Sequence, residues 1–127
     1  METEGADCLN KSLKEGKLVK LAGITSIAKS LGALAVTQKL FHQAMEEHRV
    51  VSRAVTDRQA LGACLDFARD HRLLVEPACG AALSAVYSKL DLGLDKDNAP
   101  LIIVVCGGNM ASLELFEQWK QQLGMKE

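Results

Sequence analysis

The sequence predicts an α/β fold: a partial open parallel sheet with flanking helices, in one partial domain over residues 1–127. Segments of strand character alternate along the chain with amphipathic helical segments, and this order is typical of a layered α/β structure. The run LIIVVC at residues 101–106 is apolar at every position, which predicts a strand buried on both faces in a parallel sheet. Two or three strands make a small sheet, so this strand has few neighbours within the chain.

The first half of the chain predicts helices with recognisable ends. Residues 6–14 have polar helical character, and Gly16 ends that run. Thr37 is the expected N-cap of an amphipathic helix in which apolar pairs recur at four-residue spacing over residues 40–45.

Residues 50–55 are rich in valine and predict a short strand before another helix. Thr56 and Gln59 stand three positions apart and form a capping box at the start of that helix. One face of the helix is apolar and carries Leu61, Cys64, Leu65 and Ala68.

In the second half, residues 73–75 predict a strand, and Pro77 suits the first turn of a helix of small residues over 78–90. A turn at residues 98–100 precedes the apolar run, and the Gly107-Gly108-Asn109 turn follows it. The final helix has one apolar side, formed by Leu113, Phe116, Trp119 and Leu123, with Gly124 as the expected C-cap.

Composition and charge exclude several classes of protein. The chain is 48% hydrophobic and 24% charged, as in one ordinary globular domain rather than a disordered or fibrous chain. Its formal charge of -1 gives no indication that it binds nucleic acid or an anionic membrane surface. We therefore expect small molecules or proteins as partners.

The N-terminus METEGADC is acidic and polar, and the longest apolar run, residues 101–106, is far shorter than the roughly 20 residues of a bilayer span. We expect no signal peptide, no membrane segment and a cytoplasmic location. The four cysteines lie far apart, without a C-x-x-C motif or histidines at zinc-ligand spacing, which predicts reduced thiols.

The segment IIVVCGGN at residues 102–109 is the most informative for function. In open α/β sheets, ligands bind beyond the carboxyl ends of the strands, where Cys106, Gly107 and Gly108 stand. Glycines let a planar ring or a phosphate approach the backbone, and the next helix offers free N–H donors. An ordinary tight turn accounts for these three residues equally well.

Other candidate residues favour structural roles when each is taken alone. Glu76 stands directly before a helix, where it serves the helix dipole or, as the alternative, reaches into a site. Cys79 and Cys64 are typical of tight core packing. The segment ITSIAKSLG at residues 24–32 is typical of an ordinary helix start, and no Walker, G-x-S-x-G or H-E-x-x-H pattern occurs.

Four segments taken together resemble the C-terminal portion of the serine dehydratase and serine dehydratase-like family. They are METEGA (1–6), ITSIAKSLG (24–32), VEPACGAALSAVYS (75–88) and IIVVCGGN (102–109). The resemblance implies the C-terminal part of the large domain of a fold-type-II pyridoxal-phosphate enzyme, which is similar to the tryptophan synthase β subunit. It also implies a lyase of amino-acid catabolism and gluconeogenesis, which deaminates L-serine to pyruvate or L-threonine to 2-oxobutyrate, and a homodimer.

The resemblance also implies the residues around the cofactor. The Cys106 sulfur faces the pyridine nitrogen, Ser30 lies against one face of the ring, and Gly107 and Gly108 line the site. A neutral thiol cannot hold that nitrogen protonated as a carboxylate would, so we hypothesise that Cys106 favours β-elimination over transamination.

A monovalent-cation site, usually for potassium, is implied as well. Its ligands are the Glu2 side chain and the carbonyls of Ala6, Leu31 and Ala33, all oxygen donors as a hard cation requires.

The sequence also departs from the family pattern. It contains neither the S-x-K-[IV]-R-G motif of the Schiff-base lysine, nor a glycine-rich phosphate loop, nor the Ser-Gly-Asn substrate loop. No lysine, Lys29 included, has the required context, so we assign no catalytic residue. Because the family carries METxGA internally, we expect Met1 to be an internal methionine of a longer enzyme.

Two alternatives stay open. One is a non-catalytic short form that associates with a full-length dehydratase subunit and modulates it. The other is an independent α/β module that binds a small ligand at the turn formed by residues 106–108.

Overall fold

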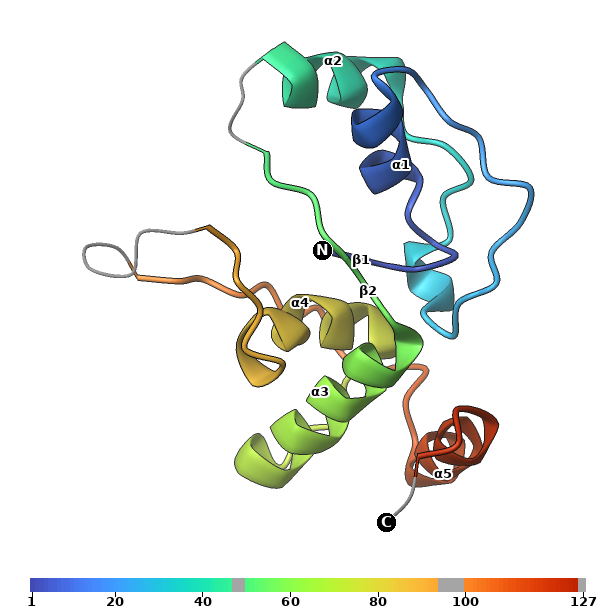
Figure 1. The fold of residues 1–127 in the computed structure, drawn as a ribbon. Helices are drawn as coiled ribbons and strands as arrows, with labels where there is room; N and C mark the ends of the chain where they lie inside the picture. The colour runs from blue at the N-terminus through green and yellow to red at the C-terminus, as the bar shows by residue number, and fades with distance from the viewer. Residues whose placement is uncertain (47–49, 94–99, 126–127) are drawn as a thin grey trace.

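The computed structural model describes residues 1–46, 50–93 and 100–125 (Figure 1). Strands β1 (Glu2–Thr3) and β2 (Ala54–Val55) pair in parallel, with Glu2 opposite Ala54 and Thr3 opposite Val55. In Figure 1 this pair lies between a group formed by α1 and α2 and a second group formed by α3 and α4. The expected parallel sheet is therefore present as a small open sheet, and the valine-rich segment contributes its last two residues.

The N-terminal group is made of two short helices. Helix α1 (Cys8–Glu15) ends at Gly16, whose φ of 65° is a left-handed conformation that glycine adopts without strain. Helix α2 (Gln38–Glu46) begins after Thr37, whose hydroxyl accepts a bond from the Leu40 N–H at 3.3 Å. Both predicted ends are confirmed. A short 3-10 helix, η1 (Lys29–Leu31), lies in the segment between them.

Helices α3 (Asp57–His71) and α4 (Pro77–Tyr87) form the packed centre of the fold. The capping box of Thr56 and Gln59 is present at the start of α3, and Pro77 is at the start of α4, as predicted. A side chain at Gly80 would overlap the carbonyl oxygen of Ala60, so the two helices approach at backbone distance. Their buried apolar residues include Leu61, Ala63, Cys64, Cys79 and Leu83.

Helix α5 (Leu113–Gln122) begins at Ser112, whose hydroxyl accepts a bond from the Leu115 N–H at 3.2 Å. Phe116 is buried in the core, but Leu113 is 66% exposed because the apolar cluster around Phe116 does not extend to it. The predicted apolar side of this helix is therefore buried at Phe116 and exposed at Leu113. The C-cap is Leu123, and Gly124 follows it with φ 61°.

Two predicted strands are absent from the described part of the chain. Residues 73–75 and 101–106 have no regular secondary structure and no strand pairing among the described residues, and the expected burial of the second segment on both faces is wrong. Ile102 is 82% exposed and Val104 is 70% exposed. A strand requires backbone partners on a neighbouring strand, and the described residues supply none beside this segment.

The predicted turn at 98–100 lies largely outside the described residues. Within residues 1–46, 50–93 and 100–125, no helix combines the length and apolar character that crossing a bilayer demands.

Candidate functional site

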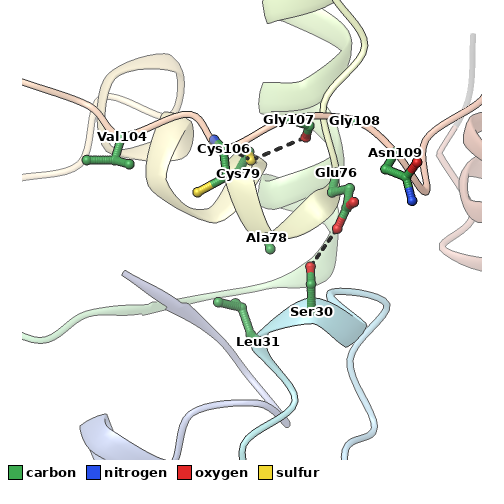
Figure 2. A pocket seen from close by; sticks show the side chains of 10 residues that line it. All are labelled: Ser30, Leu31, Glu76, Ala78, Cys79, Val104, Cys106, Gly107, Gly108 and Asn109. Atoms are coloured by element: carbon green, nitrogen blue, oxygen red, sulfur yellow. Dashed lines mark hydrogen bonds between the residues drawn. The ribbon is translucent and has the colours of Figure 1, made fainter.

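A pocket of about 370 Å³ lies between η1, the start of α4 and the segment that follows Val104 (Figure 2). Its lining includes all four residues expected around a cofactor, which are Ser30, Cys106, Gly107 and Gly108. It also includes Leu31, Glu76, Ala78, Cys79, Val104 and Asn109. The fold therefore brings together three segments that are distant in the sequence.

Glu76 occupies the N-cap position of α4, yet its side chain makes no capping bond to that helix. Its carboxylate instead accepts a bond from the Ser30 hydroxyl at 2.7 Å and one from the Met110 N–H at 3.2 Å. In the sequence, a role at the helix dipole is the favoured interpretation of this residue. The structure supports the alternative, because the side chain lines the pocket.

The Cys106 thiol stands at the carboxyl end of the apolar segment. The Cys106 N–H donates to the sulfur of Cys79 at 3.3 Å, and the Cys79 thiol donates to the Gly107 carbonyl at 3.6 Å. Cys79 is buried, whereas Cys106 is exposed, and Figure 2 shows its sulfur directed from the turn toward the side where η1 lies. Cys79 thus shapes the turn, and Cys106 is the thiol that a ligand in the pocket can meet.

The two glycines of the turn are required for different structural reasons. Gly107 has φ 149°, which side chains rarely adopt, and a Cβ there would meet nothing within 4 Å. A Cβ on Gly108 would overlap the carbonyl oxygen of Leu74, so backbone packing demands this glycine. Close approach of a ligand is therefore an explanation for Gly107, while Gly108 is explained by packing.

The lining suits a planar heteroaromatic cofactor. Leu31, Ala78 and Val104 provide apolar walls, and Ser30 and Cys106 provide hydrogen-bonding groups, which is the usual composition of a cofactor pocket. The thiol of Cys106 is a weak donor and acceptor that can meet a ring nitrogen. These residues fit the ring of pyridoxal phosphate.

A second pocket, of about 390 Å³, collects three of the four residues expected to hold a cation, namely Glu2, Leu31 and Ala33. Ala6 is buried and is not part of its lining. The carboxylate of Glu2 accepts bonds from the N–H groups of Leu9 at 3.1 Å and Asn10 at 2.7 Å, so it caps α1.

This pocket offers oxygen donors. A carboxylate has about four acceptor sites, so Glu2 keeps capacity for a cation. The described residues contain no cluster of three His, Cys, Asp or Glu side chains able to hold a metal ion. An oxygen-only site of this kind suits an alkali cation better than a transition metal.

The remaining thiols are part of the core. Burial raises the pKa of Cys64 from 9.0 to about 12, and Cys79 beside it adds to the rise. Burial and the nearby charge of Glu2 also raise the pKa of Cys8. The prediction that Cys64 is a packing residue is confirmed, because its side chain is fully buried.

Two contacts at the site cannot be predicted from the sequence, namely those between Ser30 and Glu76 and between Cys79 and Cys106. The position of Glu76 before a proline is visible in the sequence, but nothing local indicates that Ser30 meets its carboxylate. Asn109, which belongs to the CGGN turn, was not predicted as a lining residue and does line the pocket.

Comparisons with known proteins identify the family of the chain. The model of the family described as "Pyridoxal-phosphate dependent enzyme" matches residues 1–107. The chain is 44% identical to an L-serine dehydratase/L-threonine deaminase of Mus musculus, over 98% of this chain and 40% of that protein. It is also 44% identical to a serine dehydratase-like protein of Mus musculus, over 98% of this chain and 39% of that protein. The chain therefore spans about two fifths of the length of these curated relatives.

A solved structure of a fungal L-serine ammonia-lyase from Rhizomucor miehei is similar to 95% of this chain and 39% of its own, with a TM-score of 0.84 and 33% identity. This likeness confirms the expected fold class, the partial parallel sheet and flanking helices of a fold-type-II enzyme. Since the family model covers well over half of the chain and the relatives agree with it, the chain belongs to the family of pyridoxal-phosphate-dependent enzymes.

Proposed function

We propose that the protein containing this chain is an L-serine/L-threonine ammonia-lyase, which converts its substrate to pyruvate or 2-oxobutyrate and ammonia. The observation that carries the proposal is the single pocket shared by Ser30, Cys106, Gly107 and Gly108 in a chain of this family. The names of the relatives, L-serine dehydratase/L-threonine deaminase and L-serine ammonia-lyase, support the substrate class.

Bound pyridoxal phosphate supplies the electron sink that labilises bonds at the α-carbon of an amino acid. In our proposal, Cys106 faces the pyridine nitrogen and Ser30 lies against one face of the ring. Gly107 leaves room for the ring beside the backbone, and Leu31 and Val104 exclude water from its flanks. Because a neutral thiol does not hold the ring nitrogen protonated, the electron sink is moderate and elimination is favoured.

A monovalent cation, with potassium as the expected ion, belongs to the same proposal. The Glu2 carboxylate and the carbonyls of Ala6, Leu31 and Ala33 are its ligands. Leu31 lines both pockets, so an ion there supports the segment that also carries Ser30. Residues 1–127 form one part of a single domain in this proposal, and the enzyme is a cytoplasmic homodimer.

The test is the intact mass of the endogenous protein together with formation of 2-oxo acid from L-serine and L-threonine in the presence of pyridoxal phosphate. A mass well above 13.7 kDa, the mass of these 127 residues, with pyruvate formed, supports the proposal. A protein of any mass that releases no pyruvate or 2-oxobutyrate contradicts it.

A second candidate is a non-catalytic short form that associates with a full-length dehydratase subunit. The observation that favours it is the exposure of Ile102 and Val104, apolar residues suited to an interface. Co-purification of a 13.7 kDa protein with a full-length homologue supports this candidate, and failure to associate removes it.

A further inference from the structure

We infer that Glu76 is a positioning residue of the cofactor pocket, whose carboxylate holds Ser30 and the turn after Cys106 in one arrangement. The inference rests on the proposed function, because it concerns the same pocket. Figure 2 shows Glu76 spanning the pocket edge, with the turn on one side and η1 on the other.

The first half of the arrangement is the bond to Ser30. The Ser30 hydroxyl donates to the Glu76 carboxylate at 2.7 Å, a short bond to a charged acceptor. A hydroxyl has one proton to donate, so this bond orients the serine and leaves its lone pairs free to face the pocket. Glu76 thereby selects one orientation of the residue that we place against the cofactor ring.

The second half is the bond to the turn. The other carboxylate oxygen accepts from the Met110 N–H at 3.2 Å, and the Glu76 N–H donates to the Gly107 carbonyl at 3.1 Å. These bonds hold the turn at two points, on both sides of Gly108. The position of Cys106, which precedes the turn, depends on them.

Other roles for this carboxylate are not supported. It makes no capping bond to α4, and within the described residues no lysine, arginine or histidine forms an ion pair with it. The nearby Lys29 donates to the Ile24 carbonyl instead. The hydrogen bonds of the Glu76 side chain in the structure therefore go to the two segments that form the pocket.

The experiment uses the endogenous protein at its natural length and measures its dissociation constant for pyridoxal 5′-phosphate, together with the absorbance of the bound cofactor. We expect Glu76→Gln to weaken binding by roughly tenfold and to shift the absorbance maximum, because an amide is a weaker acceptor than a carboxylate. Ser30→Ala is expected to produce a similar loss and Ser30→Thr, which keeps the hydroxyl, to restore binding. Glu117→Gln, on α5 and paired with Lys120, is the matched control.

A double variant shows whether Ser30 and Glu76 act together or independently on cofactor binding. If Ser30 acts through Glu76, the double variant Ser30→Ala/Glu76→Gln loses little more affinity than Glu76→Gln alone. Thermal unfolding of each variant detects a general loss of structure. If Glu76→Gln lowers the unfolding midpoint, the positioning role is judged from Ser30→Ala alone. Ser30 is exposed, so replacing its hydroxymethyl group with a methyl group should not disturb the fold.

The outcomes distinguish the two proposals. A wild-type protein that binds no pyridoxal phosphate contradicts the proposed function, and the inference about Glu76 is then overturned with it. A wild-type protein that binds the cofactor, with Ser30→Ala and Glu76→Gln equal to it in affinity and absorbance, leaves the function standing and overturns the positioning role.

Discussion

Cys79 on α4 and Cys106 at the end of the apolar segment are neighbours in space but have different roles. Cys79 is buried, accepts the Cys106 N–H and donates to the Gly107 carbonyl, so it is held by the backbone of the turn. Cys106 is exposed and lines the pocket. These contacts assign the Cys79 thiol to structure, and they leave the Cys106 thiol available for the cofactor that we propose.

The proposed role of Cys106 can be tested by the products of the reaction. Cys106→Asp in the enzyme at its natural length should raise transamination several-fold relative to elimination, because a carboxylate holds the ring nitrogen protonated. Cys106→Ser, which keeps a neutral donor, is the control. The measurement is the ratio of transamination to elimination products, and an unchanged ratio in the aspartate variant would count against the role.

The raised pKa of Cys64 makes stability depend on pH. Burial raises this pKa from 9.0 to about 12, so the folded protein keeps the proton that the unfolded chain loses. The stability that the protonated Cys64 thiol contributes is complete below about pH 9. It is lost between about pH 9 and 12, where the unfolding free energy falls by about 1.4 kcal/mol for each pH unit. Urea unfolding of the wild type should show this decline, and Cys64→Ala should reduce it. An identical decline in both proteins would contradict the assignment.

At the scale of elements, the close packing of α3 on α4 supports the site. The Cys64 thiol on α3 donates to the Glu76 carbonyl at 3.4 Å, next to the start of α4. Phe116 of α5 joins the same apolar cluster as Leu61 and Val75. Movement of α3 against α4 would therefore displace Glu76, and with it one edge of the pocket.

Two glycines in these helices provide a matched pair of variants. Gly80→Ala should lower the unfolding free energy by about 3 kcal/mol, because the new methyl group overlaps the Ala60 carbonyl and crowds Cys64. Gly62→Ala should raise it by about 0.5–1 kcal/mol, because its Cβ meets nothing within 4 Å and alanine favours the helix. Chemical denaturation measures both. Equal effects of the two substitutions would refute close packing at Gly80.

At the scale of the whole molecule, the exposed apolar segment is the main feature. Leu101, Ile102 and Val104 are exposed, and together with Met1 and Val51 they line a third pocket, of about 420 Å³. The relatives are about two and a half times as long as the chain, which covers 40% of the mouse dehydratase. Exposed apolar surfaces of this kind commonly mark sites of contact with further protein.

Charge placed on this surface should therefore change association without changing folding. Ile102→Lys combined with Val104→Thr should make the 127-residue chain more monomeric, with an unfolding free energy within about 0.5 kcal/mol of the wild type. Leu61→Ala, in the buried core, should instead cost about 3 kcal/mol. Light scattering and denaturant titration measure the two effects. Unchanged self-association would show that the segment is not the interface.

Local chemistry made several elements predictable from the sequence. The left-handed end of α1 at Gly16, the capping box of Thr56 and Gln59, and Pro77 at the start of α4 depend on residues within one helical turn of each other. The resemblance of four short segments predicted the family, which the comparisons confirm, and four residues that line one pocket in the structure. The burial of Cys64 also followed from its place on an apolar helix face.

Contacts between distant segments were decided by the tertiary structure. The helix ends and the apolar character of residues 101–106 could be read from the sequence, because they depend on residues close together along the chain. Only the fold decided that Glu76 meets Ser30 and that Cys79 holds the turn beside Cys106. The fold also leaves the apolar segment without strand pairing among the described residues, because strand pairing requires a partner that local sequence does not specify.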